Sequence, residues 1–348
     1  MGGAENFVAD LSNAMESEHD IVICCIKEKG VTTSKISPQI KIDCLEKGEG
    51  NPVGFAFRLA EYIRNIKPDV VHLHSLGVLL DVAVALAFSY KCTFVVTCHG
   101  HLSHYSKNKY KRFIRRFIEV PAFLSVDRIV TVSNELKNIL PWPVSKRVTT
   151  ILNGVYVANE PVERAQGKDV NELIYAGRLA KVKNLGSVIH AIKQIEDQLN
   201  VKLRFQILGE GPEEEFLKNL VRELDVKTEI NFIGYVSDVR SWYRNSDIFI
   251  LPSFYEGISI ALLEAMAESL AVIVTDVGGN REIVTNDVSG IVVEADDVDG
   301  LASAIARLAC DDDLRRDLQK NGFNTVKTLF NLEVATWRYL QLYQGYDN

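Results

Sequence analysis

The sequence predicts an α/β protein of two domains, each wound around a parallel sheet. Short β-rich runs alternate with amphipathic stretches along most of the 348 residues, which is the pattern of strands joined by crossover helices. Single hydrophobic cores stop growing near roughly 250 to 300 residues, so a chain of this length is expected to divide. Residues 153–169 contain Asn-Gly, a proline and a charged run with glycine, and this composition indicates the linker.

The predicted elements follow one another in two comparable series. Strands are expected at residues 19–25, 40–44, 69–73, 93–98, 128–132 and 148–152, and then at 172–176, 203–208, 230–233, 248–251, 272–275 and 290–293. Helices are expected at residues 5–16, 54–65, 110–123, 134–140, 184–198, 213–224, 258–267 and 298–309, with two more after residue 311 that end near 333–343. Each half therefore has the pattern of a Rossmann-type unit.

The composition excludes several classes of protein. A chain with 47% hydrophobic residues buries a core and is not disordered. The most apolar stretch, 76–88, is interrupted by Asp81 and is shorter than the roughly 18 to 20 residues of a spanning helix. The six cysteines form no CxxC pair and no metal-finger spacing, so we expect reduced thiols in a cytoplasmic protein. The N-terminus lacks the basic start and apolar core of a signal peptide.

The most informative stretch is 251–267, where a buried strand leads into an amphipathic helix. Such a turn offers free amide groups and the positive end of a helix dipole, which together suit a diphosphate. Glu256 lies in the turn and Glu264 about two turns into the helix. Arg178 and Lys183 follow the strand at 172–176, and both can bind phosphate oxygens. Because ligands of wound sheets bind at the carboxyl ends of the strands, these side chains are expected to form one site.

Several motifs together resemble the retaining glycosyltransferases of family 4, also called group 1, which have the GT-B fold of two Rossmann-like domains around a deep cleft. The resemblance covers nearly the whole chain. It rests on Pro68-Asp69-Val70-Val71-His72-Leu73-His74, Thr97-Cys98-His99-Gly100, Val132-Ser133, Asn153-Gly154-Val155, the Arg178/Lys183 pair, Gly209-x-Gly211-Pro212, Glu256-x7-Glu264 and Gly278-Gly279-x-x-Glu282. Ser269 and Ala271 depart from it, because family members usually have Gly and Pro there.

The resemblance implies a domain plan and a reaction. Residues 1–158 would bind the acceptor, 168–325 would bind the nucleotide sugar, and 326–348 would form a C-terminal helix that packs back on the first domain. The implied activity is transfer of a sugar, with retention at C1, from a nucleotide sugar of the UDP type to a saccharide or lipid-linked saccharide. The implied setting is synthesis of a bacterial capsule, exopolysaccharide or O-antigen.

The resemblance also implies roles for individual residues. Arg178 and Lys183 would neutralise the donor diphosphate, Glu264 would accept hydrogen bonds from the ribose, and Glu256 with the backbone after it would contact the transferred sugar. The turn 234–236 would lie near the base. The implied nucleotide-sugar site comprises Gly3, Gly177, Arg178, Lys183, Gly209, Gly234, Tyr235, Val236, Glu256, Gly257, Ile258, Ser259 and Glu264.

Histidines define the chemistry expected of the first half. By the resemblance, His99 at the end of a buried strand contacts the donor sugar and the reacting centre, so the catalytic residues would be His99, Arg178, Lys183 and Glu256. His74 is a candidate for the acceptor side. His72, within its strand, is expected to be a hydrogen-bonded core residue. No carboxylate or cysteine joins the histidines at ligand spacing, and neither a metal nor another cofactor is expected.

One segment carries most of the positive charge. Residues 1–160 have a net charge of +3 and the remainder −10, and six basic residues without an acidic one lie between Lys107 and Arg116. As a helix, this segment would present Lys111, Arg112, Arg115 and Arg116 beside an apolar face, which suits anionic lipid headgroups. Peripheral binding to the inner face of the cytoplasmic membrane is therefore a hypothesis, with a soluble surface helix as the alternative. Nucleic acid is not an expected partner, because no binding motif is present.

Two other readings of the whole chain stay open. A nucleotide-sugar epimerase or hydrolase of the same fold would have the same donor site, and an inactive scaffold would retain only part of it. The family's first strand normally leads into Gly-Gly-x-Glu, yet Gly2-Gly3-Ala4-Glu5 directly follows Met1. The first domain is therefore expected to lack its first strand, as it would if this chain started at an internal methionine.

Overall fold

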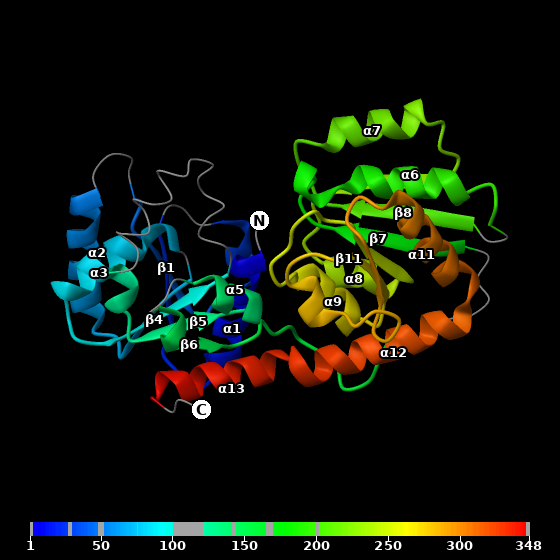
Figure 1. The fold of residues 1–348 in the computed structure, drawn as a ribbon. Helices are drawn as coiled ribbons and strands as arrows, with labels where there is room; N and C mark the ends of the chain where they lie inside the picture. The colour runs from blue at the N-terminus through cyan, green and yellow to red at the C-terminus, as the bar shows by residue number, and fades with distance from the viewer. Residues whose placement is uncertain are drawn as a thin grey trace. The chain divides into compact units, whose positions relative to one another are not determined.

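The computed structural model describes residues 3–26, 30–47, 52–74, 76–99, 121–140, 144–164, 170–199 and 202–345. The chain divides into two compact units, one formed by Met1–Asn153 together with Leu332–Asn348 and the other by Gly154–Asn331. Both are α/β units with parallel sheets (Figure 1). Every strand expected from the sequence is present within a few residues of its expected bounds.

The first unit contains a four-stranded parallel sheet and a separate parallel pair. The strands β3 (Val70–Leu73), β4 (Thr93–Cys98), β5 (Arg128–Thr131) and β6 (Val148–Thr150) form the sheet in chain order. The pair consists of β1 (Val22–Cys25) and β2 (Lys41–Cys44). The helices are α1 (Gly3–Met15), α2 (Pro52–Ile66), α3 (Leu79–Ala87), α5 (Asn134–Ile139) and α13 (Leu332–Tyr343).

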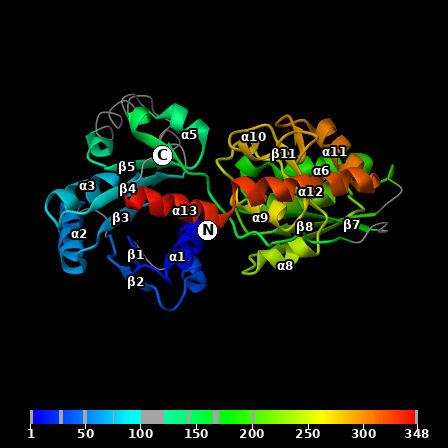
Figure 2. The ribbon, with the colours of Figure 1, turned by 90° about the horizontal axis from the view of Figure 1, so that it is seen from below.

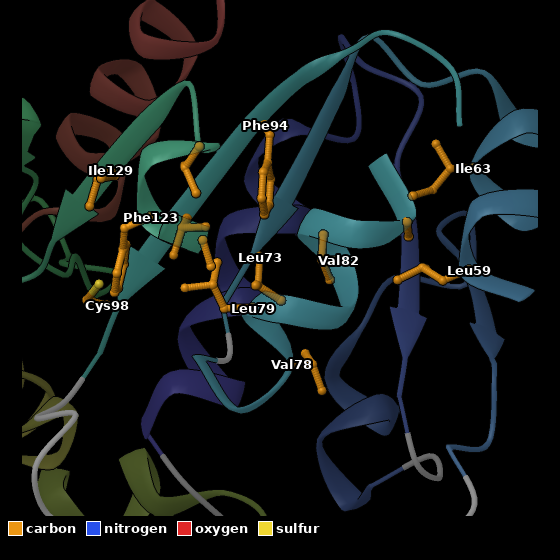
Figure 3. Packing of buried hydrophobic residues seen from close by; sticks show 14 of the residues in the cluster. Leu59, Ile63, Leu73, Val78, Leu79, Val82, Phe94, Cys98, Phe123 and Ile129 are labelled. Atoms are coloured by element: carbon orange, nitrogen blue, oxygen red, sulfur yellow. The ribbon is translucent and has the colours of Figure 1, made fainter. Parts of the chain in front are cut away.

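Alternation along β4 and β5 builds two cores in this unit, because successive side chains of a strand point to opposite faces. Phe94 and Ile129 lie in a cluster with Leu79 and Val82 of α3 (Figure 3). Val95 and Val130, their neighbours in the chain, lie instead in a cluster with α1 and α13. The last helix of the chain, α13, therefore packs beside the first one (Figure 2).

The second unit is built on a six-stranded parallel sheet in the order β12-β11-β10-β7-β8-β9. Its strands are β7 (Val170–Ala176), β8 (Lys202–Leu208), β9 (Glu229–Gly234), β10 (Ile248–Leu251), β11 (Ala271–Thr275) and β12 (Ile291–Val293). Its helices are α6 (Leu185–Ile195), α7 (Glu214–Glu223), α8 (Val239–Arg244), α9 (Ile260–Ala267), α10 (Asn280–Ile283), α11 (Val298–Cys310) and α12 (Asp312–Leu329).

The strand order of the second unit reverses between β7 and β10. Two strands follow β7 outward in one direction, and two follow β10 in the other. Right-handed crossovers then put the connecting helices on opposite faces, and α6 lies on one face while α9 and α12 lie on the other (Figure 1). At such a reversal the loops at the carboxyl ends of the strands diverge, which is where wound sheets bind their ligands.

Candidate active site

Hydrogen bonds between backbone groups join the loops at the carboxyl edge of the second unit. The amide of Gly177, after β7, donates to the carbonyl of Leu208 at 2.9 Å, and the amide of Gly209 donates to Gly234 at the end of β9 at 2.8 Å. Gly209 has a φ of +120°, and a Cβ on it would lie 2.0 Å from the carbonyl oxygen of Gly177. Glycine at 209 is therefore required both by the backbone conformation and by the close approach of the two loops.

An ion pair joins the two loops that flank the strand-order reversal. Lys183 closes the short 3-10 turn Lys181–Lys183 after β7, and Glu256 lies after β10. The Nζ of Lys183 donates to Oε1 of Glu256 at 2.5 Å, and Oγ of Ser253 donates to the same oxygen at 2.6 Å. The Glu256 side chain is only 9% exposed. Its carboxylate is therefore held in one orientation by two donors.

Arg178 is an exposed cation of the loop after β7. Its backbone carbonyl accepts a hydrogen bond from the hydroxyl of Tyr175 at 3.1 Å, so the buried Tyr175 ring anchors the loop. No hydrogen bond or ion pair joins the Arg178 guanidinium to any other residue in the described ranges. Among the described residues, Arg178 therefore has no anionic partner, whereas Lys183 in the same loop is paired with Glu256.

The helix α9 begins where the sequence predicts a phosphate-binding turn. Ser259 is its N-cap, and the Ser259 hydroxyl oxygen accepts from the amide of Leu262 at 3.3 Å. The other first-turn amides have no partner within a helix, so the turn after Glu256 offers donors for an anion. Gly257 is half-buried and Ile258 is buried in that turn, while Glu264 is half-buried within the helix.

The remaining donor-site candidates are dispersed over loops and helix ends. Gly234 closes β9 with a φ of +79°, and Tyr235 after it is 44% exposed, with Val236 half-buried. Gly3 is the first residue of α1, in the other unit. The membrane candidates Lys111, Arg112, Arg115 and Arg116 lie outside the described residues.

The histidines of the first unit form a stacked cluster. The Nδ1 of His74 and the Nε2 of His99 are 3.0 Å apart, and the rings of His72 and His74 have centroids 3.9 Å apart. His72 has hydrogen-bond partners at both ring nitrogens, Tyr343 at 2.6 Å and Thr97 at 2.8 Å. The expectation that His72 is hydrogen-bonded is thereby confirmed, although the residue is half-buried and not part of the core.

All three imidazoles are held neutral at physiological pH. Burial, with a smaller contribution from the nearby His99, lowers the pKa of His72 to about 3. Burial lowers the pKa of His99 to about 4. The pKa of His74 is well below its ordinary value because of burial, with His72 and His99 adding to the shift. The cluster can therefore donate and accept hydrogen bonds without carrying charge.

Two kinds of contributing residue were not singled out from the sequence. Ser253, which orients Glu256, lies in the stretch 251–267, where the glutamates are the stronger signal. Tyr339 and Tyr343 of α13 hydrogen-bond to Thr97 and His72 across more than 240 residues of chain. Their spacing of four residues predicts that both side chains lie on one face of a helix. No local pattern predicts which strand that face packs against.

Two α/β units with parallel sheets, the second with a strand-order reversal, are the architecture of the GT-B fold. Residues 158–325 match the family "Glycosyl transferases group 1", and residues 1–159 match "Glycosyltransferase Family 4". The chain belongs to this group 1, or family 4, of glycosyltransferases, as the resemblance implied.

Named relatives cover most of the chain. An Escherichia coli UDP-Gal:alpha-D-GlcNAc-diphosphoundecaprenol alpha-1,3-galactosyltransferase is 29% identical over 302 residues, covering 82% of this chain and 77% of that protein. A Campylobacter jejuni enzyme is named GalNAc-alpha-(1->4)-GalNAc-alpha-(1->3)-diNAcBac-PP-undecaprenol alpha-1,4-N-acetyl-D-galactosaminyltransferase. It is 25% identical and covers 92% of this chain and 89% of its own.

Solved structures share the fold at lower identity. A glycosyltransferase from Rickettsia africae superposes with a TM-score of 0.81 at 20% identity, covering 99% of this chain and 95% of that one. Anabaena HepE in complex with UDP and glucose gives a TM-score of 0.83 at 15% identity, covering 99% and 96%. Within the described ranges, no helix is both long and apolar enough to cross a membrane.

Proposed function

We propose that this glycosyltransferase moves a sugar from a UDP-sugar to a lipid-linked saccharide, with retention at C1, in the synthesis of a bacterial surface polysaccharide. The main observation in favour of a nucleotide-sugar donor is the pair of cations at the strand-order reversal. Arg178 is exposed there, and Lys183 is held by Glu256. The two relatives described above, one of which is named for UDP-Gal and both for undecaprenol-linked acceptors, support the donor and acceptor classes.

The chemistry demands positive charge at the leaving group. When the C1–O bond to the diphosphate breaks, negative charge grows on the departing oxygen, and preorganised donors there lower the barrier. Arg178, Lys183 and the first amides of α9 are such donors. Glu256 would then bind the transferred sugar and Glu264 the ribose, while the turn Gly234 to Val236 would contact the base. His99 would contact the reacting centre, and His74 would lie on the acceptor side.

An exposed apolar surface on α2 and α3 supports work at a membrane. Phe57 of α2 is 54% exposed and Phe88, after α3, is 59% exposed, with ring centroids 5.9 Å apart. Leu80 and Val84 continue this surface along α3 at helical spacing and are also exposed. Single exposed hydrophobic residues are ordinary, whereas a contiguous group marks an interaction site.

The charges around this apolar surface favour an anionic bilayer as its partner. Arg64 donates to the backbone carbonyl of Phe88, and Lys67 and Lys91 are exposed nearby in the chain, as are the acidic Glu61 and Asp69. The basic side chains outnumber the acidic ones. Aromatic side chains with such cations suit the headgroup region of a membrane.

A product assay tests the reaction. The full chain is incubated with UDP-galactose, UDP-glucose and their N-acetyl counterparts and with an undecaprenyl-diphosphate-linked sugar, and products are identified by mass spectrometry and by NMR of the new linkage. Arg178→Met should reduce turnover by about 100-fold to 1,000-fold. The matched control is Lys181→Met, an exposed lysine three residues further along the same loop, which should retain activity.

Other outcomes of this assay contradict the proposal. Consumption of the donor without any acceptor would indicate a hydrolase or epimerase. UDP binding by calorimetry without turnover of any donor would indicate an inactive scaffold. A product whose new linkage has the opposite anomeric configuration to the donor would overturn retention.

A vesicle assay tests the membrane surface separately. Co-sedimentation with phosphatidylcholine vesicles containing phosphatidylglycerol should be lost in a Phe57→Ser, Phe88→Ser variant. Phe216→Ser is the control, because Phe216 is 56% exposed on α7 in the other unit. If the α2–α3 variant binds as the native chain does, and replacing the basic residues between 107 and 116 abolishes binding instead, the surface is misassigned.

A further inference from the structure

The stacked histidines contain one polar atom that the rest of the cluster does not satisfy. The Nδ1 of His99 is buried and has no hydrogen-bond partner among the described residues. The opposite nitrogen of the same ring, Nε2, lies 3.0 Å from Nδ1 of His74. Phe7 meets the His99 ring edge-on, with centroids 5.8 Å apart, so the ring is fixed by packing as well as by the hydrogen bond.

Only one proton can lie between the two facing nitrogens. Each neutral imidazole carries one N–H and one lone pair. If His74 Nδ1 carried the proton, His99 would accept at Nε2 and its own N–H would be at Nδ1, buried without an acceptor. Orphaned buried N–H groups are rarer than under-satisfied acceptors. His99 therefore carries its proton at Nε2 and leaves a lone pair at Nδ1.

We infer that His74 is a positioning residue, which fixes both the ring orientation and the Nε2–H tautomer of His99 by accepting its proton in a hydrogen bond. The hydrogen bond made by one imidazole nitrogen decides which nitrogen is protonated. His74 is itself held by stacking on His72, which is bonded to Tyr343 of the C-terminal helix. His99 can then offer only an acceptor at Nδ1, to a hydroxyl group of a substrate.

The role in turnover rests on the proposed function, but the tautomer does not. Histidine-selective ¹⁵N NMR of the full chain at pH 7 should find His99 protonated at Nε2 and unprotonated at Nδ1. In His74→Phe, which keeps an aromatic ring for stacking but removes the acceptor, His99 should become a mixture of tautomers. His74→Asn, whose side-chain oxygen can occupy the place of Nδ1, should restore the native pattern.

Turnover should follow the same order. His74→Phe should lower kcat by roughly 10-fold to 100-fold, the range observed when a partner that orients a metal-bound histidine is removed, while KM for the donor stays near its native value. His74→Asn should recover most of that loss. Tyr90→Phe, at an exposed position of the first unit away from the histidine contacts, is the control and should leave the His99 tautomer unchanged.

Two results would overturn the inference. One is a native His99 protonated at Nδ1, and the other is a His99 spectrum that His74→Phe does not alter. Because the spectra require no substrate, a chain that proved inactive with every donor would refute the proposed function and leave this inference to be decided by the tautomer alone.

Discussion

Replacing Arg164 should destabilise the second unit, because this side chain caps two helices at once. Its guanidinium donates to the carbonyls of Tyr243, Arg244 and Ser246 at the end of α8, and to those of Glu268 and Ser269 at the end of α9. Carbonyls at helix C-termini lack intrahelical partners and attract cations. Burial lowers the pKa of Arg164 to about 10, with Asp247 and Glu268 opposing the shift, so the group stays charged at neutral pH.

The magnitude follows from the number and kind of these bonds. A hydrogen bond to a charged group contributes about 1.5 to 3 kcal/mol. Five bonds from one guanidinium are not additive, and the half-buried side chain lets water replace some of them. We therefore expect Arg164→Met to lower the free energy of unfolding by about 3 to 4 kcal/mol. For a unit of this size that is a decrease in Tm of roughly 6 to 16 °C.

Differential scanning calorimetry of the full chain measures this effect. Arg164→Lys provides the matched control, since it keeps the charge but not the planar fork of donors, and its Tm should fall between those of the native chain and Arg164→Met. If Arg164→Met unfolds within about 1 °C of the native chain, the carbonyls are satisfied by water and the double-cap argument is wrong.

Three further predictions concern the histidines, the edge loops and the ion pair. In the folded chain His72 and His99 have pKa values of about 3 and 4, whereas in the unfolded chain they become protonated below about pH 6.5. The free energy of unfolding should therefore decrease as the pH falls below 6.5, by up to about 1.4 kcal/mol per pH unit for each residue. Urea unfolding at pH 7.5, 6 and 5 measures this decrease. Gly209→Ala should weaken UDP binding at least about 10-fold in calorimetry, because the new Cβ would lie 2.0 Å from a backbone oxygen and a strained φ costs about 1 to 3 kcal/mol. Lys183→Met alone should weaken UDP binding more than the double substitution Lys183→Met, Glu256→Gln does. The single substitution leaves the buried carboxylate of Glu256 without its cation, next to the negatively charged diphosphate of UDP.

Each of these predictions has a distinct control or contrary result. A stability that stays constant between pH 7.5 and 5 would show that the imidazoles are accessible to protons in the folded chain. Gly186→Ala in α6, where a Cβ meets only ordinary contacts, should leave UDP binding intact. Strictly additive losses in the cycle of Lys183 and Glu256 would mean that the pair does not act as a unit.

The strands and the helix after Glu256 could be predicted because their signals are local. Short runs rich in Val and Ile and bounded by turn residues indicate strands, and Ser259 precedes an apolar helix pattern. The short helices α3 and α8 were not expected. In α3 the apolar residues continue around the helix, with Leu80 and Val84 exposed, so no amphipathic period marks it.

Contacts between distant segments could not be predicted from local patterns. The composition of 153–169 predicts a linker, and nothing local indicates that Arg164 binds the ends of α8 and α9. Ser269 shows the same limit. It departs from the family's usual glycine, and in the structure it has a φ of +59°, a left-handed conformation that glycine adopts without strain. Its hydroxyl accepts from the amide of Val162 at 3.0 Å, which gives the serine a partner that glycine lacks.

The sheet order explains why Lys183 and Glu256, which we propose belong to the donor site, are far apart in sequence but meet in space. Lys183 follows β7 and Glu256 follows β10, and these strands are neighbours only because the sheet grows outward from them in both directions. Their loops therefore lead to helices on opposite faces, and the carboxylate of Glu256 joins the two across the reversal. A motif search finds the two residues as separate signals, whereas the topology makes them one unit. Loss of either partner should consequently alter the loop of the other, which is why the paired substitution is the more informative experiment than either single one.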